Sequence, residues 1–436
     1  MTTGQDHGEP LPAGDPATAP PRPKEIAIAF PQEALDADAV RVIRRLTEAG
    51  HQAYLVGGCV RDLLFGLRPK DFDVVTSAHP PEVRRLFRNC RIIGRRFRLA
   101  HVYFRNKIVE VATFRANVTE PRDGDLLIRD DNRFGTADED AVRRDFTINA
   151  LFYDVDRQVI VDYVGGVEDA ERRIIRCIGD PPIRFREDPI RMLRAVRHAA
   201  RLGCTIERET LEAIATYRRH VLEAAPPRIG EELLRMYRGG AMAPAFDLLR
   251  ETGLLEVVLP ELAAHLEAAG EEEVRALRRL LRTIDAVTQQ GQELPASLQL
   301  AALLSPVLME AAGPSPRDAG ARVSEALRPI AQRLSVSKRD CERIRQVLLA
   351  LERFVPGKGR KRRSASVFMR RTYFPEALRL FELVAETTGD LVEEARRWRA
   401  RYSELFPAGP PEDRRKPRRK RRGGRREHGE KGARTG

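Results

Sequence analysis

The pattern of apolar residues changes once along this chain, near residue 188, and this change limits the folds open to it. Before it, short segments rich in β-branched and aromatic residues alternate with turn residues, which is typical of strands. After it, apolar residues recur at steps of three and four residues to about residue 405, which is typical of helices. We therefore predict an α+β fold class, in which a mixed sheet with helices precedes a long all-helical region.

Six segments of the first part are predicted to be strands. They are Ala53–Val56, Asp71–Thr76, Arg98–Phe104, Lys107–Phe114, Thr147–Asp154 and Val159–Val164. Residues 115–142 are polar and rich in Gly and Asp, which predicts a loop. In the second part, the helix that follows Asp188 is predicted to end at Gly203, because glycine suits the left-handed position after a helix.

Composition argues against a membrane protein and against a secreted one. The chain has no run of about 18 apolar residues, and its first 25 residues lack the apolar core of a secretory signal. Its five cysteines form no CxxC pair and no zinc spacing with histidine. We expect a cytoplasmic protein without stable membrane insertion, with reduced cysteines, several of them buried as small apolar side chains.

Most of the net charge of +13 lies at the C-terminus. Residues 412–436 hold twelve Lys or Arg and four Asp or Glu, a net +8. Such a segment cannot bury a core, so we expect it to be disordered and to bind a polyanion such as nucleic acid. Its central basic residues are Arg418, Arg419, Lys420, Arg421 and Arg422. A tail that serves only solubility is the alternative.

A strand followed by Gly57–Gly58 and a short helix that closes at Gly66 predicts a phosphate site. Glycines allow a ligand close to the backbone, and a helix N-terminus offers free N–H groups to an anion. Arg61, in the first turn of this helix, can add a charge-assisted contact to phosphate. Taken alone, the glycine pair equally fits an ordinary tight turn.

Three acidic residues in predicted strands suggest a metal site. Asp71 and Asp73 share one face of a strand, with Cα atoms about 6.6 Å apart, and divalent cations prefer such oxygen ligands. Glu110 interrupts an apolar strand, and a third carboxylate fits a two-metal site. Solvated acids are the alternative for each, but the neighbouring phosphate site favours nucleotide chemistry.

Five motifs follow one another in an order that is found in one enzyme family. They are LVGGCVRD, the DFD pair, RRDFTINAL (Arg143–Leu151), VDYVGGVEDA (Val161–Ala170) and RFREDPIRMLRAVR (Arg184–Arg197). Together they resemble the class II polymerase-beta-type nucleotidyltransferases, which include tRNA CCA-adding enzymes and bacterial poly(A) polymerases. The resemblance is strong over roughly residues 40–260 and weak over the remaining helical part.

The resemblance implies a role for each motif. The catalytic residues would be Asp71, Asp73 and Glu110, with Asp71 and Asp73 binding two Mg²⁺ ions, for which Mn²⁺ can substitute. The triphosphate of ATP, the substrate, would be held by Gly57, Gly58, Arg61 and Arg144, and its ribose and base by Asp145, Asp188 and Arg191. Residues 161–170 would form a hinge. The two metals would assist attack of an RNA 3′-hydroxyl on the α-phosphate and loss of pyrophosphate, so no histidine is expected to be catalytic.

From the residues alone, the fifth motif has plainer interpretations. Asp188 fits the N-cap of a helix that starts with Pro189. Arg191 and the arginines that follow at steps of three and four residues form one basic face of this helix. That face fits contact with the base, the triphosphate or RNA, and it equally fits a solvated stripe.

The segment RIIGRRFRLAHV (Arg91–Val102) resembles a stretch typical of bacterial poly(A) polymerases. This resemblance implies a template-independent adenylyltransferase that acts on the 3′ ends of mRNA and other transcripts, with RNA-decay proteins as partners. A tRNA nucleotidyltransferase that adds CCA or only A is the alternative, and a non-catalytic RNA-binding derivative is another. Residues expected to contact RNA, besides the tail, are Arg95, Arg96, Arg98, Lys361, Arg362 and Arg363. For the last three, a plain surface loop is the alternative.

These observations predict five regions along the chain. They are a disordered arm at 1–25, a catalytic head at 26–175, neck helices that bind the base and RNA at 176–260, a helical body and leg that bind RNA at 261–408, and a disordered basic tail at 409–436.

Overall fold

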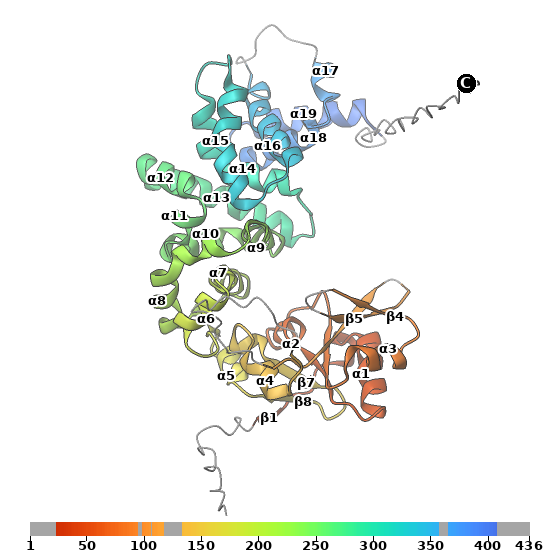
Figure 1. Ribbon diagram of the computed structural model, residues 1–436. Helices are drawn as coiled ribbons and strands as arrows, with labels where there is room; N and C mark the ends of the chain where they lie inside the picture. Colours follow the sequence, from red (N-terminus) through yellow and green to blue (C-terminus); the bar gives the residue numbers. More distant parts are fainter. Residues whose placement is uncertain (1–22, 95–97, 106, 117–132, 357–364, 408–436) are drawn as a thin grey trace, which may run out of the picture.

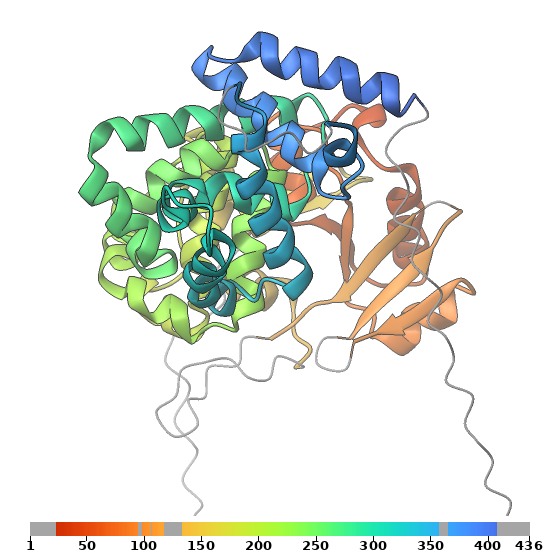
Figure 2. The ribbon, with the colours of Figure 1, turned by 90° about the horizontal axis from the view of Figure 1, so that it is seen from above.

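The computed structural model of the protein describes residues 23–94, 98–105, 107–116, 133–356 and 365–407. Within these ranges, an eight-stranded sheet with helices forms the head, and helices make up nearly all of the chain from residue 176 on, the helical region. Both views place the helical region to one side of the sheet, and it rises from the head in an arc (Figure 1, Figure 2). The predicted α+β fold is therefore confirmed.

The sheet of the head is mixed. In spatial order its strands are β1 (Lys24–Ala27), β8 (Val159–Asp162), β7 (Leu151–Asp154), β2 (Ala53–Val56), β3 (Asp73–Thr76), β6 (Ile108–Thr113), β5 (Leu99–Tyr103) and β4 (Cys90–Ile93). Neighbouring strands are antiparallel, except that β3 and β6 run parallel. The parallel pair needs a long connection, and this connection contains β4 and β5.

Helices cover the two faces of the sheet unequally. One face packs against α1 (Ala37–Glu48), α2 (Gly58–Leu64) and α3 (Pro80–Leu86) through buried side chains of β2 to β7. The other face packs against α4 (Ala137–Val142), but among the described residues that second cluster takes no side chain from β4 or β5. The helices that the structure describes therefore cover the β4–β5 end of the sheet on one face only.

Five of the six predicted strands lie where the sequence places them, with ends that differ by one or two residues. The sixth is half wrong, because Thr147–Asn149 forms a 3₁₀ turn before β7. The predicted loop at 115–142 is also partly wrong, because it ends in α4. There the Thr136 and Glu139 side chains form a capping box that starts the helix. Strands β1 and β4 were not predicted, because these four-residue edge strands are too short to show clear alternation.

The helical region contains fourteen described α-helices. They are α6 (Pro181–Glu187), α7 (Ile190–Leu202), α8 (Arg208–Tyr217), α9 (Pro226–Arg238), α10 (Met242–Glu251), α11 (Leu254–Val258), α12 (Pro260–Ala269), α13 (Glu271–Gln289), α14 (Ala296–Ala312), α15 (Ala319–Leu334), α16 (Lys338–Ala350), α17 (Ala365–Met369), α18 (Phe374–Thr388) and α19 (Val392–Leu405). Gly203 ends α7 in the left-handed conformation (φ 63°), as predicted. One departure from the all-helical prediction is β10 (Thr205–Ile206), which pairs with β9 (Ile174–Ile175).

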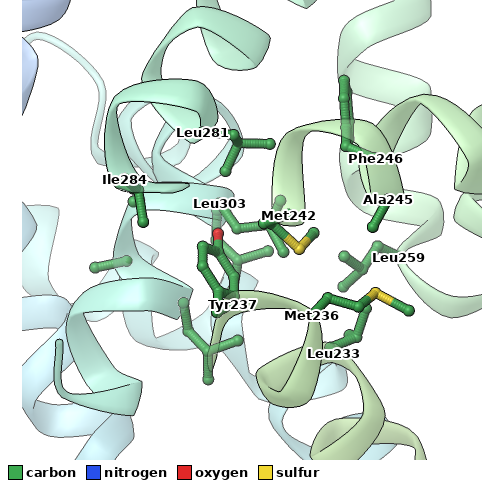
Figure 3. Packing of buried hydrophobic residues seen from close by; sticks show 14 of the residues in the cluster. Leu233, Met236, Tyr237, Met242, Ala245, Phe246, Leu259, Leu281, Ile284 and Leu303 are labelled. Atoms are coloured by element: carbon green, nitrogen blue, oxygen red, sulfur yellow. The ribbon is translucent and has the colours of Figure 1, made fainter. Parts of the chain in front are cut away.

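The helical region has a continuous apolar core. Figure 3 shows Tyr237 of α9, Met242 of α10 and Leu303 of α14 packed together in it. Asp285 of α13 also enters this core, where its carboxylate accepts hydrogen bonds from the N–H groups of Met242 (2.8 Å) and Ala243 (2.7 Å). A carboxylate from one helix thus caps the start of another and fixes their relative position.

The described helices include none that combines the length and the apolar character needed to cross a membrane. All five cysteines are free thiols, and four of them are buried. The expectation that several act as small apolar side chains is confirmed.

The Gly165–Gly166 turn lies in the segment that the family resemblance assigns to a hinge. The buried carboxylate of Asp162 accepts hydrogen bonds from the N–H groups of Val164, Gly165, Gly166 and Val167, at 2.9 to 3.1 Å. A Cβ at Gly166 would lie 2.2 Å from the carbonyl oxygen of Thr147, whereas one at Gly165 (φ +79°) would meet nothing within 4 Å.

We expect Gly166→Ala to lower the free energy of unfolding by about 3 kcal/mol, because the new methyl group forces the backbone apart. Gly165→Ala is the matched control and should cost only about 1–2 kcal/mol, the penalty for a left-handed alanine. Urea unfolding measures both. Equal losses would contradict the close packing at Gly166.

Candidate active site

The three predicted catalytic acids come together where β3 begins. Asp73 is the first residue of β3, and Asp71 lies two residues before it. Val74 is the register partner of Val111 in the parallel strand β6, so Glu110 lies beside Asp73. Burial, followed by the negative charges of Glu110 and Asp71, raises the pKa of Asp73 to about 6, against the opposing charge of Arg144. Carboxylates crowded in this way favour a cation between them.

Glu110 faces away from the helices that cover the sheet. Its neighbours Val109 and Val111 are buried against that helical layer, and the Glu110 side chain is 50% exposed. In the antiparallel strand β5 its register partner is His101, whose Nε2 lies 3.5 Å from Glu110 Oε1. The contact between His101 and Glu110 was not predicted from the sequence, although alternation along the two strands places both side chains on the same face.

The predicted phosphate loop lies directly beside these acids. β2 ends at Val56, the register partner of Asp73, and Gly57 turns the chain into α2 with φ +74° and ψ −127°. The positive φ favours glycine at this position, and a Cβ there would lie 3.3 Å from Arg144 Nη1, a tight contact. The Arg144 guanidinium is held by Asp140 (2.7 Å), near Asp73. Gly57, Gly58 and Arg144 thus line the same place as the three acids.

Arg61, the fourth predicted phosphate ligand, points elsewhere. Its side chain is 5% exposed. It lies 2.6 Å from Asp62, donates to Asn149 Oδ1 at 2.8 Å, and lies 3.2 Å from His198 Nδ1 of α7. In this arrangement Arg61 joins α2 to the helical region.

The arginines of α7 do not form a solvated stripe. Arg194 pairs with Asp145 (2.6 Å), Arg197 with Glu232 of α9 (2.6 Å), and Arg201 with Asp62 of α2 (2.7 Å). Burial tends to raise the pKa of Asp145, but the charge of Arg194 and a hydrogen bond from Asn149 hold it below its ordinary value.

His198 sits at the centre of this network. Burial, together with Arg197 and Arg61, holds the pKa of His198 well below its usual range, so the ring is neutral. Since the side chain is 3% exposed, its position agrees with a structural role and excludes direct contact with RNA in this arrangement.

The two predicted base-binding residues have other partners in the structure. Asp188 accepts two hydrogen bonds from Arg228, both of 2.9 Å. The N-cap residue of α7 is Pro189, and no side chain caps the helix, so the N-cap interpretation of Asp188 is wrong. Arg191 is buried and donates to Glu187 (3.3 Å) and to the carbonyl oxygen of Arg143 (3.4 Å).

The described residues include no group of three or more His, Cys, Asp and Glu side chains placed to hold a metal ion. Mg²⁺ usually binds through one or two carboxylates, water and substrate phosphates, so its binding does not require such a group. Asp71 and Asp73 supply two carboxylates, and the mutual repulsion that raises the pKa of Asp73 is what a cation would relieve. The donor set therefore fits magnesium that binds together with a nucleotide.

Most predicted RNA-contacting residues lie outside the described residues, namely Arg95, Arg96, Lys361, Arg362, Arg363, Arg418, Arg419, Lys420, Arg421 and Arg422. Arg98 is described and exposed, just before β5.

Asp73→Asn should stabilise the metal-free protein at alkaline pH. Because the pKa of Asp73 is raised in the folded state, stability is lost as the pH rises from about 4 through about 6. Asparagine avoids this loss, so in EDTA we expect a gain of about 1 kcal/mol at pH 8 and a smaller one at pH 5, measured by urea unfolding.

Magnesium gives the complementary test, because it should stabilise the wild type more than Asp73→Asn. Lys107→Met, which removes exposed pairs with Asp36 and Asp38, is a control without this pH dependence or magnesium dependence. An Asp73→Asn variant less stable than wild type at pH 8 in EDTA would contradict the crowding of the acids.

Comparison with known proteins gives matches in both the head and the helical region. Residues 53–176 match the family described as the poly A polymerase head domain. Residues 203–266 match the family described as the probable RNA and SrmB-binding site of polymerase A.

Individual relatives extend this similarity over most of the chain. Poly(A) polymerase I of Salmonella typhi is 37% identical over 407 residues, covering 88% of this chain and 85% of the relative. A CCA-adding enzyme of Bacillus velezensis is 38% identical over 237 residues, covering 53% and 59%. The crystal structure of the Bacillus stearothermophilus CCA-adding enzyme in complex with CTP is similar, with a TM-score of 0.62 and 26% identity, over 85% of this chain and 82% of that one.

Proposed function

The chain belongs to the family of poly(A) polymerases and CCA-adding enzymes, and we propose that it is a template-independent polynucleotide adenylyltransferase that adds AMP from ATP to RNA 3′ ends. The observation that carries this choice is the extent of sequence similarity, because the fold is shared with CCA-adding enzymes over most of the chain. A poly(A) polymerase I aligns with 88% of the chain, whereas a CCA-adding enzyme aligns with 53%. The acids and the phosphate loop described above supply the chemistry that nucleotidyl transfer needs.

The reaction forms a bond between the RNA 3′-oxygen and the α-phosphorus of ATP and breaks the bond from that phosphorus to pyrophosphate. Gly57 and Gly58 allow the triphosphate close to the backbone, and Arg144 supplies a positive charge beside it. Asp71 and Asp73 would hold Mg²⁺, with Glu110 adding negative charge next to them. Bound magnesium would supply positive charge to the phosphates and the departing pyrophosphate.

The remaining predicted contacts require rearrangement of the pairs seen in the structure. Asp188 would contact the base only by sharing or leaving Arg228, and Arg191 by leaving Glu187. Asp145 would likewise share its carboxylate between Arg194 and the ribose. For Arg61, support of the phosphate loop from behind fits its position better than direct contact.

The setting of the reaction follows from the same proposal. We infer that the protein acts in the cytoplasm on mRNA and other transcripts, with RNA-decay proteins as partners. The catalytic head would lie within residues 26–175, the neck within 176–260 and the RNA-binding body and leg within 261–408.

Incubation with magnesium, ATP and a generic single-stranded RNA tests the function. We expect long adenylate tails from ATP alone. A requirement for CTP, or addition of a single nucleotide to tRNA that ends in CC, would instead support the alternative, a tRNA nucleotidyltransferase. Asp71→Asn and Asp73→Asn serve as controls, because each should abolish transfer and leave RNA affinity within about twofold. Loss of RNA binding in both would argue against a purely catalytic role.

Deletion of residues 412–436 tests the basic tail as an RNA-binding arm. For every RNA phosphate that the tail neutralises, its removal should reduce the slope of log affinity against log salt by about 0.7 for a single strand. We expect a reduction of at least about 2, with the unfolding midpoint unchanged. An unchanged slope would leave solubility as the function of the tail.

A further inference from the structure

Strands β4, β5 and β6 present two faces of opposite character. One face is buried against α1 and α3 through Cys90, Ala100, Val102, Val109 and Val111. The other face carries Arg91, Ile93, His101, Tyr103, Ile108 and Glu110. On that face Ile93 is 43% and Ile108 is 47% exposed, so two large apolar side chains meet solvent there.

This open face is continuous with the candidate active site. Register places Arg91 opposite His101 and His101 opposite Glu110, and Glu110 lies beside Asp73. One cross-strand row therefore runs from the acids to the edge strand β4. At about 4.8 Å per strand, the row covers about 10 Å between β6 and β4, the length of about three stacked bases.

The far end of the row offers an aromatic surface with a positive charge. The guanidinium carbon of Arg91 lies 5.6 Å from the centroid of the Tyr103 ring, and the His101 ring lies 6.4 Å from it. We name Arg91, Ile93, His101, Tyr103 and Ile108 the open-face platform.

We propose that the open-face platform seats the single-stranded 3′ end of the RNA substrate, with terminal bases stacked on Tyr103 and a phosphate beside Arg91. This inference rests on the proposed adenylyl transfer and specifies where the RNA substrate of that reaction binds. Aromatic rings and exposed apolar side chains stack on any base, whereas the platform has few groups that could distinguish base edges. Such a seat accepts the 3′ ends of many transcripts.

Charge sets the direction of the strand on this platform. Phosphates are attracted to Arg91 at the β4 end of the row, so upstream nucleotides lie over β4 and the 3′-hydroxyl lies toward the acids. This strand direction lets the 3′-hydroxyl attack the α-phosphate of a nucleotide that is bound beside Gly57. The Arg91–Tyr103 pair is thus a primer-positioning element.

Steady-state kinetics with a 15-nucleotide oligoadenylate tests the platform. We expect Tyr103→Ala to raise the KM for this RNA about tenfold, because the stacking of one base is removed, while the KM for ATP and kcat change less than twofold. Tyr103→Phe keeps the ring and should restore the wild-type KM. Arg91→Met should also raise the RNA KM and reduce the salt slope by about 0.7, the contribution of one phosphate.

Arg41→Met is the matched control. Arg41 of α1 lies 6.0 Å from the centroid of the Phe104 ring, a similar cation–aromatic pair on the helix-covered side of the sheet. We expect its RNA KM to equal that of wild type. An unchanged RNA KM in both Tyr103→Ala and Arg91→Met, or an equal rise in Arg41→Met, would overturn the proposal.

Photo-crosslinking separates failure of the platform from failure of the proposed function. An RNA with 4-thiouridine at its 3′ end should crosslink to a peptide that contains residues 91–103, whether or not the protein extends it with ATP. Crosslinks only in the helical region would overturn the platform even if tails are made. If the wild type makes no tails but crosslinks at the open-face platform, the proposed transfer reaction is wrong and the platform is still supported as an RNA-binding site.

Discussion

The parallel pairing of β3 with β6 is the constraint on which the site depends. It sets Val74 against Val111 and thereby brings Asp73 beside Glu110, although these acids are far apart in sequence. Like charges resist such an arrangement, as the raised pKa of Asp73 indicates. The apolar residues on the opposite face hold the register, because a slip of one residue would expose them. The packing of the sheet thus holds Asp73 beside Glu110 despite the repulsion between their charges.

A second constraint joins the phosphate loop to the helical region. Arg61 and Asp62 lie on the helix that follows Gly57, and they contact His198 and Arg201 of α7. Buried charges of this kind must be paired, because an unpaired one is costly. A shift of α7 would therefore be transmitted to the Gly57–Gly58 turn. These pairs link the position of the helical region mechanically to that of the proposed phosphate loop.

Sequence reasoning located the strands, the glycine turn and the three acids, because each has a local signal such as alternation, a glycine pair or i, i+2 spacing. It could not determine which arginines remain free to meet an anion. Arg61 and Arg144 both lie in family motifs, yet only Arg144 lies beside Asp73. Their difference depends on tertiary partners, because Asp62 holds Arg61 and Asp140 holds Arg144, and no local pattern predicts which arginine each carboxylate will pair with.

The distribution of paired arginines bears on how this enzyme holds a polyanion. On α7, three arginines are neutralised by carboxylates of the head and of α9, so a basic helix by sequence is not a basic surface in the fold. Arg91, in contrast, rests on an aromatic ring, and a cation over a ring keeps its full charge for a phosphate. Among the described residues, Arg91 therefore offers a positive charge to RNA on β4, at the end of the sheet where the described helices cover one face.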